Sequence, residues 1–395
     1  MSRHVILPGA TLGILGGGQL GRMFAVAART MGYRVMVLDP DPESPAAHVV
    51  DKFLAAPYDD RLALAQLARE CAAVTTEFEN VPAASLEFLA GFVPVRPSAT
   101  AVAIAQDRAR EKAFLRDNGF ETADFVVIAD AGELEPALRR IGTPALLKAT
   151  RLGYDGKGQA RVKDLASAQR GFGEMGGATS VLEELVPLES EISVALGRSA
   201  EGEMRCYPVT ENRHRDGVLD WSVVPARIEG EIGRRAVAIA ADIAEKLDYC
   251  GVLAVEFFVC GNGRLLVNEF APRPHNSAHW TLDAAATSQF EQQVRALCGL
   301  PLGDTRLLSA AAMVNLLGDL WCGDAEPAWD KILRHPEANL HLYGKRQARP
   351  GRKMGHYTCL GETPGAALNL ALEIKGELGN ETPRTHVTQR RVNAI

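Results

Sequence analysis

The chain has 395 residues, of which 47% are hydrophobic and 23% are charged. Such a length predicts two or three domains, and the composition is that of a globular protein. The formal net charge of −6, with no block of Lys and Arg, excludes a general nucleic-acid-binding surface. No signal peptide and no apolar run long enough to span a membrane are expected.

Seven cysteines lie singly along the chain, and none belongs to a C-x-x-C pair. This pattern is typical of buried, reduced thiols rather than of zinc ligands or a disulfide framework. It predicts a cytoplasmic protein.

The first predicted unit is a strand, a helix and a second strand in "LGILGGGQLGRMFAVAARTMGYRVMVLDPD", residues 12–41. This order predicts a parallel sheet, and the alternation continues to about residue 98 as one doubly wound domain. Gly16, Gly18 and Gly21 fit the G-x-G-x-x-G fingerprint, and Asp39 stands where a ribose-binding acid is expected. The segment is therefore either a nicotinamide site or a close-packed βα turn that faces another ligand.

The pattern changes near residue 100. Ala101 to Asn118 is predicted as one charged amphipathic helix closed by Gly119. Two strand-like segments then flank a glycine-rich tip from Gly153 to Gln159, which predicts a hairpin. Strands at short spacing and one long helix follow between residues 180 and 300. This part is α+β rather than doubly wound.

The predicted fold class is thus α/β and α+β, with a doubly wound N-terminal domain over residues 1–100. A second domain is expected over 101–300, with a lid subdomain at about 120–185, and a small C-terminal domain over 301–395.

Two carboxylates are predicted to face each other on a later hairpin. In "GVLAVEFFVCGNGRLLVNEFAPRPHNS" two apolar strands flank Asn262-Gly263, the favoured pair for a two-residue type I′ turn. Counting back from that turn places Glu256 opposite Glu269, on one face of the hairpin. All-oxygen ligands of this kind suit magnesium, to which Asn268 and Asn276 would add neutral oxygens. The alternative is a solvated face whose acids pair with Arg or Lys.

Three motifs precede this hairpin in the chain, and their order is informative. Lys148 lies on a strand, the glycine-rich tip with Lys157 follows, and an acidic turn at "VLEELVPLESE" comes next. A glycine-rich tip lets backbone approach phosphates and close over a nucleotide. Each motif alone also fits ordinary turn chemistry, so the order carries the argument.

That order resembles the ATP-grasp superfamily, whose members activate a carboxylate as an acyl phosphate. Within it, "GGGQLGRM", "TTEFENVP", "GYDGKGQ", "SVVPAR" and "NEFAPRPHNSAHWT" resemble the 5-(carboxyamino)imidazole ribonucleotide synthetases of purine biosynthesis, and the likeness extends to "YGKRQARPGRKMGH". The resemblance implies a ligase reaction in which ATP, bicarbonate and 5-aminoimidazole ribonucleotide give ADP, phosphate and the N-carboxylated ribonucleotide. It also implies an ATP-grasp fold, magnesium as two ions, a homodimer, and a separate mutase that takes the product.

The resemblance implies roles for individual residues, which we group by ligand. ATP would contact Arg108, Lys148, Gly153, Tyr154, Asp155, Gly156, Lys157, Gly158, Gln159, Glu183, Glu184, Leu185, Val186, Glu191, His214, Asn268 and Glu269. Magnesium would be held by Glu256 and Glu269. The ribonucleotide would contact Glu77, Tyr154, Asp155, Lys345, Arg352 and Lys353, with Gln19 and Leu20 added from the N-terminus of the first helix. Catalysis would involve Lys148, Lys157, Arg273, His275 and Asn276.

Several alternatives stay open at this point. His275 is a candidate acceptor for the amine proton or only a bicarbonate ligand, and either carboxyphosphate or free carbon dioxide carboxylates the amine. Lys157 stands where some members of the family have Arg, which would lose a bidentate contact. Other ATP-grasp ligases, a non-catalytic nucleotide sensor and a nicotinamide-dependent dehydrogenase remain as rival functions.

Overall fold

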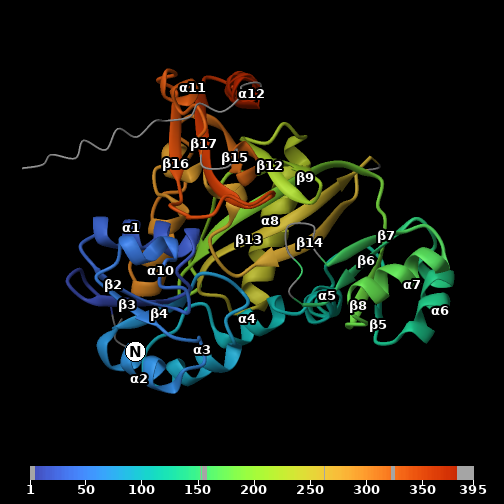
Figure 1. Cartoon of the computed structure of the whole chain (residues 1–395), viewed down its shortest axis with the longest axis horizontal. Helices are drawn as coiled ribbons and strands as arrows, with labels where there is room; N and C mark the ends of the chain where they lie inside the picture. The colour runs from blue at the N-terminus through green and yellow to red at the C-terminus, as the bar shows by residue number, and fades with distance from the viewer. Residues whose placement is uncertain (1–4, 152, 154–157, 262, 322–324, 380–395) are drawn as a thin grey trace, which may run out of the picture.

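The computed structural model describes residues 5–151, 153, 158–261, 263–321 and 325–379. The N-terminal region is a four-stranded parallel sheet in the order β3-β2-β1-β4, coloured blue in Figure 1. Its elements are β1 (Thr11–Leu15), α1 (Gln19–Thr30), β2 (Arg34–Asp39), β3 (Lys52–Ala55), α2 (Arg61–Glu70) and β4 (Ala73–Thr76). The prediction of a doubly wound parallel sheet is confirmed. Apolar side chains cover both faces of this sheet, as expected when helices flank parallel strands.

Helices α3 (Ala83–Ala90), α4 (Ala99–Ala105) and α5 (Arg108–Asp117) lead out of this sheet. The prediction of one helix from residue 101 to residue 118 is wrong, because the chain breaks between α4 and α5. Asp107 caps α5, accepting a hydrogen bond from the backbone N–H of Ala109 at 3.0 Å. The break rotates α5 so that it contacts both β14 and β8.

A second, antiparallel sheet has the order β5-β8-β6-β7, and we call it the lid sheet. Its strands are β5 (Phe125–Ile128), β6 (Ala145–Ala149), β7 (Gln159–Val162) and β8 (Ser180–Glu184), covered by α6 (Leu134–Ile141) and α7 (Leu165–Glu174). β6 and β7 pair with Lys148 opposite Gln159, which confirms the predicted hairpin. Residues 152 and 154–157 of its tip, which include the predicted Tyr154, Asp155, Gly156 and Lys157, lie outside the described residues.

The third sheet has nine strands, in the order β14-β13-β9-β11-β12-β15-β17-β16 with β10 paired to β9. Its strands are β9 (Leu188–Arg198), β10 (Met204–Cys206), β11 (Thr210–Arg215), β12 (Val218–Val224), β13 (Gly251–Cys260), β14 (Leu265–Ala271), β15 (Ala310–Leu317), β16 (Ala338–Leu342) and β17 (Lys353–Gly361). Its helices are α8 (Gly230–Lys246), α9 (Thr281–Ala284), α10 (Gln289–Cys298), α11 (Asp330–Leu333) and α12 (Pro364–Gly379). The C-terminal strands extend the central sheet rather than forming a sheet of their own.

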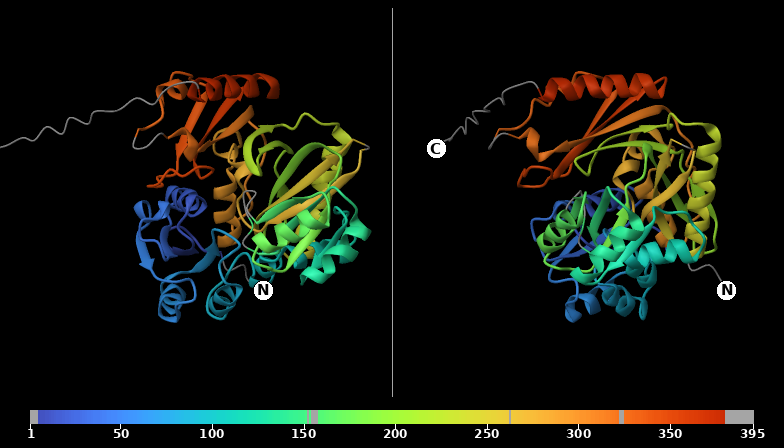
Figure 2. Two further views of the ribbon diagram at one scale, coloured as in Figure 1. Left: turned by 45° about the vertical axis from the view of Figure 1, so that its right-hand side comes forward. Right: turned by 90° about the vertical axis from the view of Figure 1, so that its right-hand side faces the viewer.

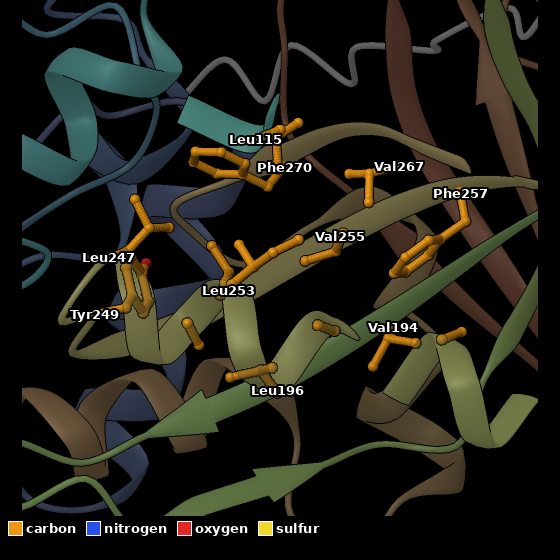
Figure 3. Close-up of a cluster of buried hydrophobic side chains, with 14 of the residues drawn as sticks. Leu115, Val194, Leu196, Leu247, Tyr249, Leu253, Val255, Phe257, Val267 and Phe270 are labelled. Atoms are coloured by element: carbon orange, nitrogen blue, oxygen red, sulfur yellow. The ribbon is translucent and has the colours of Figure 1, made fainter. Parts of the chain in front are cut away.

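Figure 2 shows the N-terminal sheet, the lid sheet and the C-terminal strands arranged around the β13–β14 hairpin. The core of the central sheet, drawn in Figure 3, packs α8 against β9 and β13 through side chains such as Leu196, Leu253 and Val255, all fully buried. Burying each such side chain contributes about 1.5–3 kcal/mol, so the hairpin is fixed on a rigid base. Among the described residues, none of the helices has the length and apolarity needed to cross a bilayer.

Candidate active site

The β13–β14 hairpin places Glu256 directly opposite Glu269, as the sequence predicts. The register next to the turn differs from the prediction. A two-residue turn would put Val259 opposite Leu266, but Val259 pairs with Leu265, so the predicted turn is wrong by one residue. A bulge at Asn268 restores the register, so the two acids still meet. Bulges redirect side chains at functional sites, and this one puts Asn268 beside the acids.

The two facing acids bring two carboxylates close together on one face of the hairpin. Burial, together with the neighbouring Glu269 carboxylate, raises the pKa of Glu256 to about 7. The buried Oδ1 of Asn268 has no hydrogen-bond partner among the described residues. Two carboxylates and an unpaired amide oxygen are the donor set that a hard cation prefers, so these residues fit magnesium.

Each acid of the hairpin also faces a basic side chain. Arg108 Nη1 lies 3.1 Å from Glu269 Oε2, and His275 Nε2 lies 3.3 Å from Glu256 Oε1. Burial and the charges of Arg273 and Lys353 lower the pKa of His275 well below its usual value, so its ring is neutral near pH 7. A neutral ring has a nitrogen lone pair that can accept a hydrogen bond or a proton, although the lowered pKa makes His275 a weaker base than a free imidazole.

Lys148 lies on β6 and pairs with a buried carboxylate on β8. Its Nζ lies 2.6 Å from Glu183 Oε2, and the side chains of Lys148 and Glu183 are 11% and 2% exposed. The acidic turn follows at once, since β8 ends at Glu184 and leaves Leu185 and Val186 between two strands. Within this break the carbonyl of Val186 accepts a hydrogen bond from the backbone N–H of Leu188 at 2.8 Å, and the Glu183 carboxylate is occupied by lysine.

Glu191 and His214 form an ion pair across β9 and β11 on the same sheet. Burial would lower the pKa of His214, but the hydrogen bond to Glu191 and the charge of Glu256 raise it. His214 is thus held by the Glu191 carboxylate and influenced by that of Glu256, and the pair borders the paired-acid hairpin.

A cavity of about 70 Å³ lies between the hairpin and the N-terminal region. Arg108, Glu269, Arg273 and His275 line it, and so does Gly153 at the base of the lid tip. This size suits a small anion such as bicarbonate next to a phosphate. The cavity therefore joins the predicted ATP residues to the predicted catalytic residues.

Arg273 reaches this cavity from the end of β14 and is held by Glu79 of the N-terminal region. Its Nε and Nη2 lie 2.6 and 3.3 Å from the two carboxylate oxygens, a bidentate pair. Burial would raise the pKa of Glu79, but the Arg273 charge lowers it. Asn276 is fixed as well, because its side-chain amide exchanges two hydrogen bonds with that of Asn315 at 3.0 and 2.8 Å.

The glycine-rich turn before α1 is filled by the chain itself. Asp39 Oδ2 accepts hydrogen bonds from Gly17 N and the Tyr58 hydroxyl, each at 2.7 Å. Glu77 accepts from the backbone N–H of Gly18, and a Cβ built at Gly18 would lie 2.0 Å from Glu77 Oε1. The glycine therefore makes room for a protein carboxylate, in the place where a dinucleotide phosphate would sit.

The basic loop, residues 345–353, closes the site from the C-terminal strands. Lys345 Nζ donates to the backbone carbonyl of Lys353 at 2.7 Å, and Arg352 donates to that of Gln347 at 2.9 Å. Burial raises the pKa of Glu77 to about 7, opposed by its hydrogen bond from Gly18 and by the charges of Lys345 and Arg273. The loop thus lies within electrostatic reach of the turn before α1.

Comparison with known proteins assigns this arrangement. Family models match residues 9–106 (ribonucleotide synthetase preATP-grasp domain), 113–290 (ATP-grasp domain) and 311–369 (phosphoribosylaminoimidazole carboxylase C-terminal domain). The N5-carboxyaminoimidazole ribonucleotide synthase of Brucella melitensis is 46% identical over 360 residues, which are 91% of this chain and 98% of the relative. The chain belongs to the N5-carboxyaminoimidazole ribonucleotide synthase family.

Other relatives agree with this assignment. The N5-carboxyaminoimidazole ribonucleotide synthase of Bacillus subtilis is 44% identical, with 91% of this chain and 93% of the relative covered. An ADP complex of N5-carboxyaminoimidazole ribonucleotide synthetase superposes with a TM-score of 0.89 at 41% identity, over 95% of this chain and 98% of that chain. The Aspergillus clavatus enzyme with ADP and 5-aminoimidazole ribonucleotide gives a TM-score of 0.87 at 30% identity, over 94% and 99%. The ATP-grasp fold prediction is confirmed, and the dehydrogenase alternative is wrong.

In this member of the N5-carboxyaminoimidazole ribonucleotide synthase family, the sequence analysis missed one half-buried group, Glu79, and two buried groups, Glu111 and Lys112. Glu79 follows Glu77 by two residues in a motif that the sequence analysis used only for its likeness to the family. Glu111 and Lys112 share the inward face of α5 with Arg108, at helical spacings of three and four. That spacing was a usable signal, but a charged helix face is normally solvated, and only the packing of α5 between β14 and β8 buries it.

Proposed function

We propose that the protein carboxylates 5-aminoimidazole ribonucleotide with bicarbonate at the expense of ATP, releasing ADP and phosphate. The observation that carries this proposal is the facing pair Glu256 and Glu269, which adjoins a small cavity lined by Arg273 and His275. The relatives, one of them solved with ADP and 5-aminoimidazole ribonucleotide, support this substrate, and the cavity supports a bicarbonate site beside the two acids.

ATP is proposed to lie between the lid sheet and the β13–β14 hairpin. Lys148 and Arg108 would neutralise its phosphates, and the backbone near Val186 would meet the adenine edge. Glu191 would bind the ribose hydroxyls beside His214. Support comes from Arg108 and Gly153, which line the cavity beside Glu269, and from the ADP complexes of relatives.

Magnesium is proposed to bind Glu256 and Glu269, with Asn268 as a neutral oxygen donor, as two ions. Bound there, the metal would offset the negative charge that develops on the ATP phosphates during transfer. The raised pKa of Glu256, caused by burial and by Glu269, supports a cation between them.

Bicarbonate is proposed to bind Arg273, His275 and Asn276. One of its oxygens attacks the γ-phosphorus of ATP, ADP leaves, and carboxyphosphate forms. The exocyclic amine of the ribonucleotide then attacks carbon by one of two routes. It attacks the carbonyl carbon of carboxyphosphate and expels phosphate, or carboxyphosphate first breaks down to phosphate and carbon dioxide, and the amine adds to the carbon dioxide. The amine loses a proton, for which neutral His275 is the proposed acceptor.

The ribonucleotide is proposed to lie between the basic loop and the glycine turn. Lys345, Arg352 and Lys353 would bind its phosphate, while Glu77 and the start of α1 at Gln19 would face the rest. Lys353 already lies close enough to Glu256 and His275 to affect the pKa of both. The phosphate site and the reaction site are thus neighbours.

One assay tests the proposal: ADP release measured with and without bicarbonate and the ribonucleotide. We expect ADP release to depend on both, and Arg352→Ala to raise KM for the ribonucleotide about 10- to 100-fold through loss of a phosphate contact. If omission of the ribonucleotide changes nothing, the substrate assignment fails. An unchanged KM in Arg352→Ala removes Arg352 from the phosphate site.

The remaining proposals concern the surroundings of the enzyme. We infer a homodimer, a cytoplasmic location and a separate mutase that consumes the N-carboxylated product. Sedimentation of the purified protein tests the dimer, and loss of product on adding such a mutase tests the transfer.

A further inference from the structure

One buried lysine has no place in the proposed reaction. Lys112 lies on α5 with a side chain only 1% exposed, and its Nζ is 3.4 Å from Glu183 Oε1. The other oxygen of Glu183 faces Lys148 at 2.6 Å. One buried carboxylate therefore stands between two ammonium groups, one sealed inside the protein and one at the edge of the site.

The local structure holds Lys112 firmly in this position. On the same helix, Arg108 pairs with Glu269 at 3.1 Å, and Glu111 accepts a hydrogen bond from the backbone N–H of Phe270 at 2.6 Å. These two contacts fix α5 on β14, while Lys112 faces β8. Oε1 of Glu183 accepts no hydrogen bond from the described residues, so Lys112 neutralises it through charge alone.

The charges around Glu183 would let this carboxylate keep one lysine partner when Lys148 moves to ATP. Burial opposes ionisation of Glu183, yet Lys148, Lys112 and Arg108 together lower its pKa to about 2. When an ATP phosphate attracts Lys148, Glu183 loses the partner that lies nearest to it. A buried carboxylate without a counter-charge is strongly unfavourable, so it would compete with ATP for Lys148 unless another cation stayed behind.

We propose that Lys112 is a positioning residue that keeps Glu183 paired while Lys148 turns to the phosphates of ATP. The inference rests on the proposed role of Lys148 in binding ATP. Lys112 itself touches no substrate. Its effect reaches the reaction through Glu183, which otherwise would retain Lys148.

The test is steady-state kinetics on Lys112→Met, with ADP release as readout. Because Glu183 would then hold Lys148, we expect KM for ATP to rise about tenfold while KM for the ribonucleotide stays unchanged. The double variant Lys112→Met/Glu183→Gln removes the competing carboxylate and should recover most of that loss. Lys112→Arg keeps the charge and should stay near wild type.

A matched control breaks an ion pair on the surface. Lys52→Met removes the contact of 2.7 Å between Lys52 and Glu70, another Lys–Glu pair but one with exposed side chains, and should change neither KM. A purely structural role for Lys112 predicts that both KM values change together and that the double variant is worse than either single one. That result overturns the inference. If Lys112→Met fails to fold, the same measurement is made on Lys112→Arg, and a joint rise of both KM values in that variant overturns the inference as well.

The proposed ATP site is tested separately with Lys148→Met. If Lys148→Met loses activity while Lys112→Met keeps the wild-type KM for ATP, only the inference on Lys112 falls. If Lys148→Met keeps the wild-type KM for ATP, the placement of ATP falls, and the inference falls with it.

Discussion

Two regions of the molecule use acidic residues at the edge of a cleft in opposite ways. In the glycine turn before α1, Asp39 and Glu77 accept hydrogen bonds from the backbone N–H groups of Gly17 and Gly18. In the β13–β14 hairpin, Glu256 and Glu269 face each other and receive no such backbone donors in the described residues. The turn has already satisfied its anion-binding groups, whereas the hairpin acids are met by side chains, Arg108 at Glu269 and His275 at Glu256. The presence of an acidic residue therefore does not by itself identify a binding site. What identifies it is whether other groups of the protein already form hydrogen bonds to that acid.

The largest expected effect comes from neutralising the hairpin. Glu256→Gln should lower kcat about 100-fold or more, because it removes one of the two charges proposed to hold magnesium. Glu70→Gln, which changes an exposed acid of a surface ion pair, is the matched control and should keep full activity. ADP release measures both. Full activity in Glu256→Gln would show that the hairpin acids, like those of the glycine turn, are not needed for the reaction.

The same variant sharpens the comparison through stability. The pKa of Glu256 in the folded protein, about 7, lies above the value of about 4.3 for an unfolded Glu. Ionisation of this group therefore costs folding stability as the pH rises between those values. In the absence of magnesium, Glu256→Gln should melt at a higher temperature than wild type at about pH 8 and show no gain near about pH 4. Thermal melts with a chelator give the answer, and equal melting temperatures at both pH values contradict the electrostatic argument.

A smaller effect is expected where the two regions meet. Glu79, just after β4, holds Arg273 at the end of β14 in a bidentate pair. Glu79→Gln should raise KM for bicarbonate about tenfold, because a misplaced guanidinium binds the anion less well. Glu211→Gln disturbs a comparable pair, with Arg227 on the surface, and serves as its control. If both variants behave alike, Glu79 does not position Arg273.

The smallest effect on activity is expected in the glycine turn. Asp39→Asn should cost about 1–3 kcal/mol of stability, because an amide cannot accept from Gly17, Tyr58 and Asp41 together. kcat should stay within about twofold of wild type, since the side chain points into the fold. Titration of the wild-type protein with reduced nicotinamide cofactor should give no saturable fluorescence change. Saturable binding would mean that the turn binds a dinucleotide although Asp39 and Glu77 occupy its N–H groups.

The sequence by itself determined much of this protein. Alternating strands and helices fixed the parallel N-terminal sheet, and the two apolar strands around Asn262-Gly263 predicted a hairpin, in which a bulge brings Glu256 opposite Glu269. These features follow from local periodicity and turn chemistry, which act over a few residues. The order of motifs from Lys148 to His275 was enough to indicate the family.

Only the tertiary structure decided how the charges are shared. Glu79 and Arg273 are separated by 194 residues, and Lys148 and Glu183 by 35, so no local pattern links them. The bulge at Asn268, the filling of the glycine turn by Glu77 and the burial of Lys112 likewise depend on which surfaces pack together. Burial sets the cost of an unpaired charge, and burial is a property of the packed chain rather than of any segment.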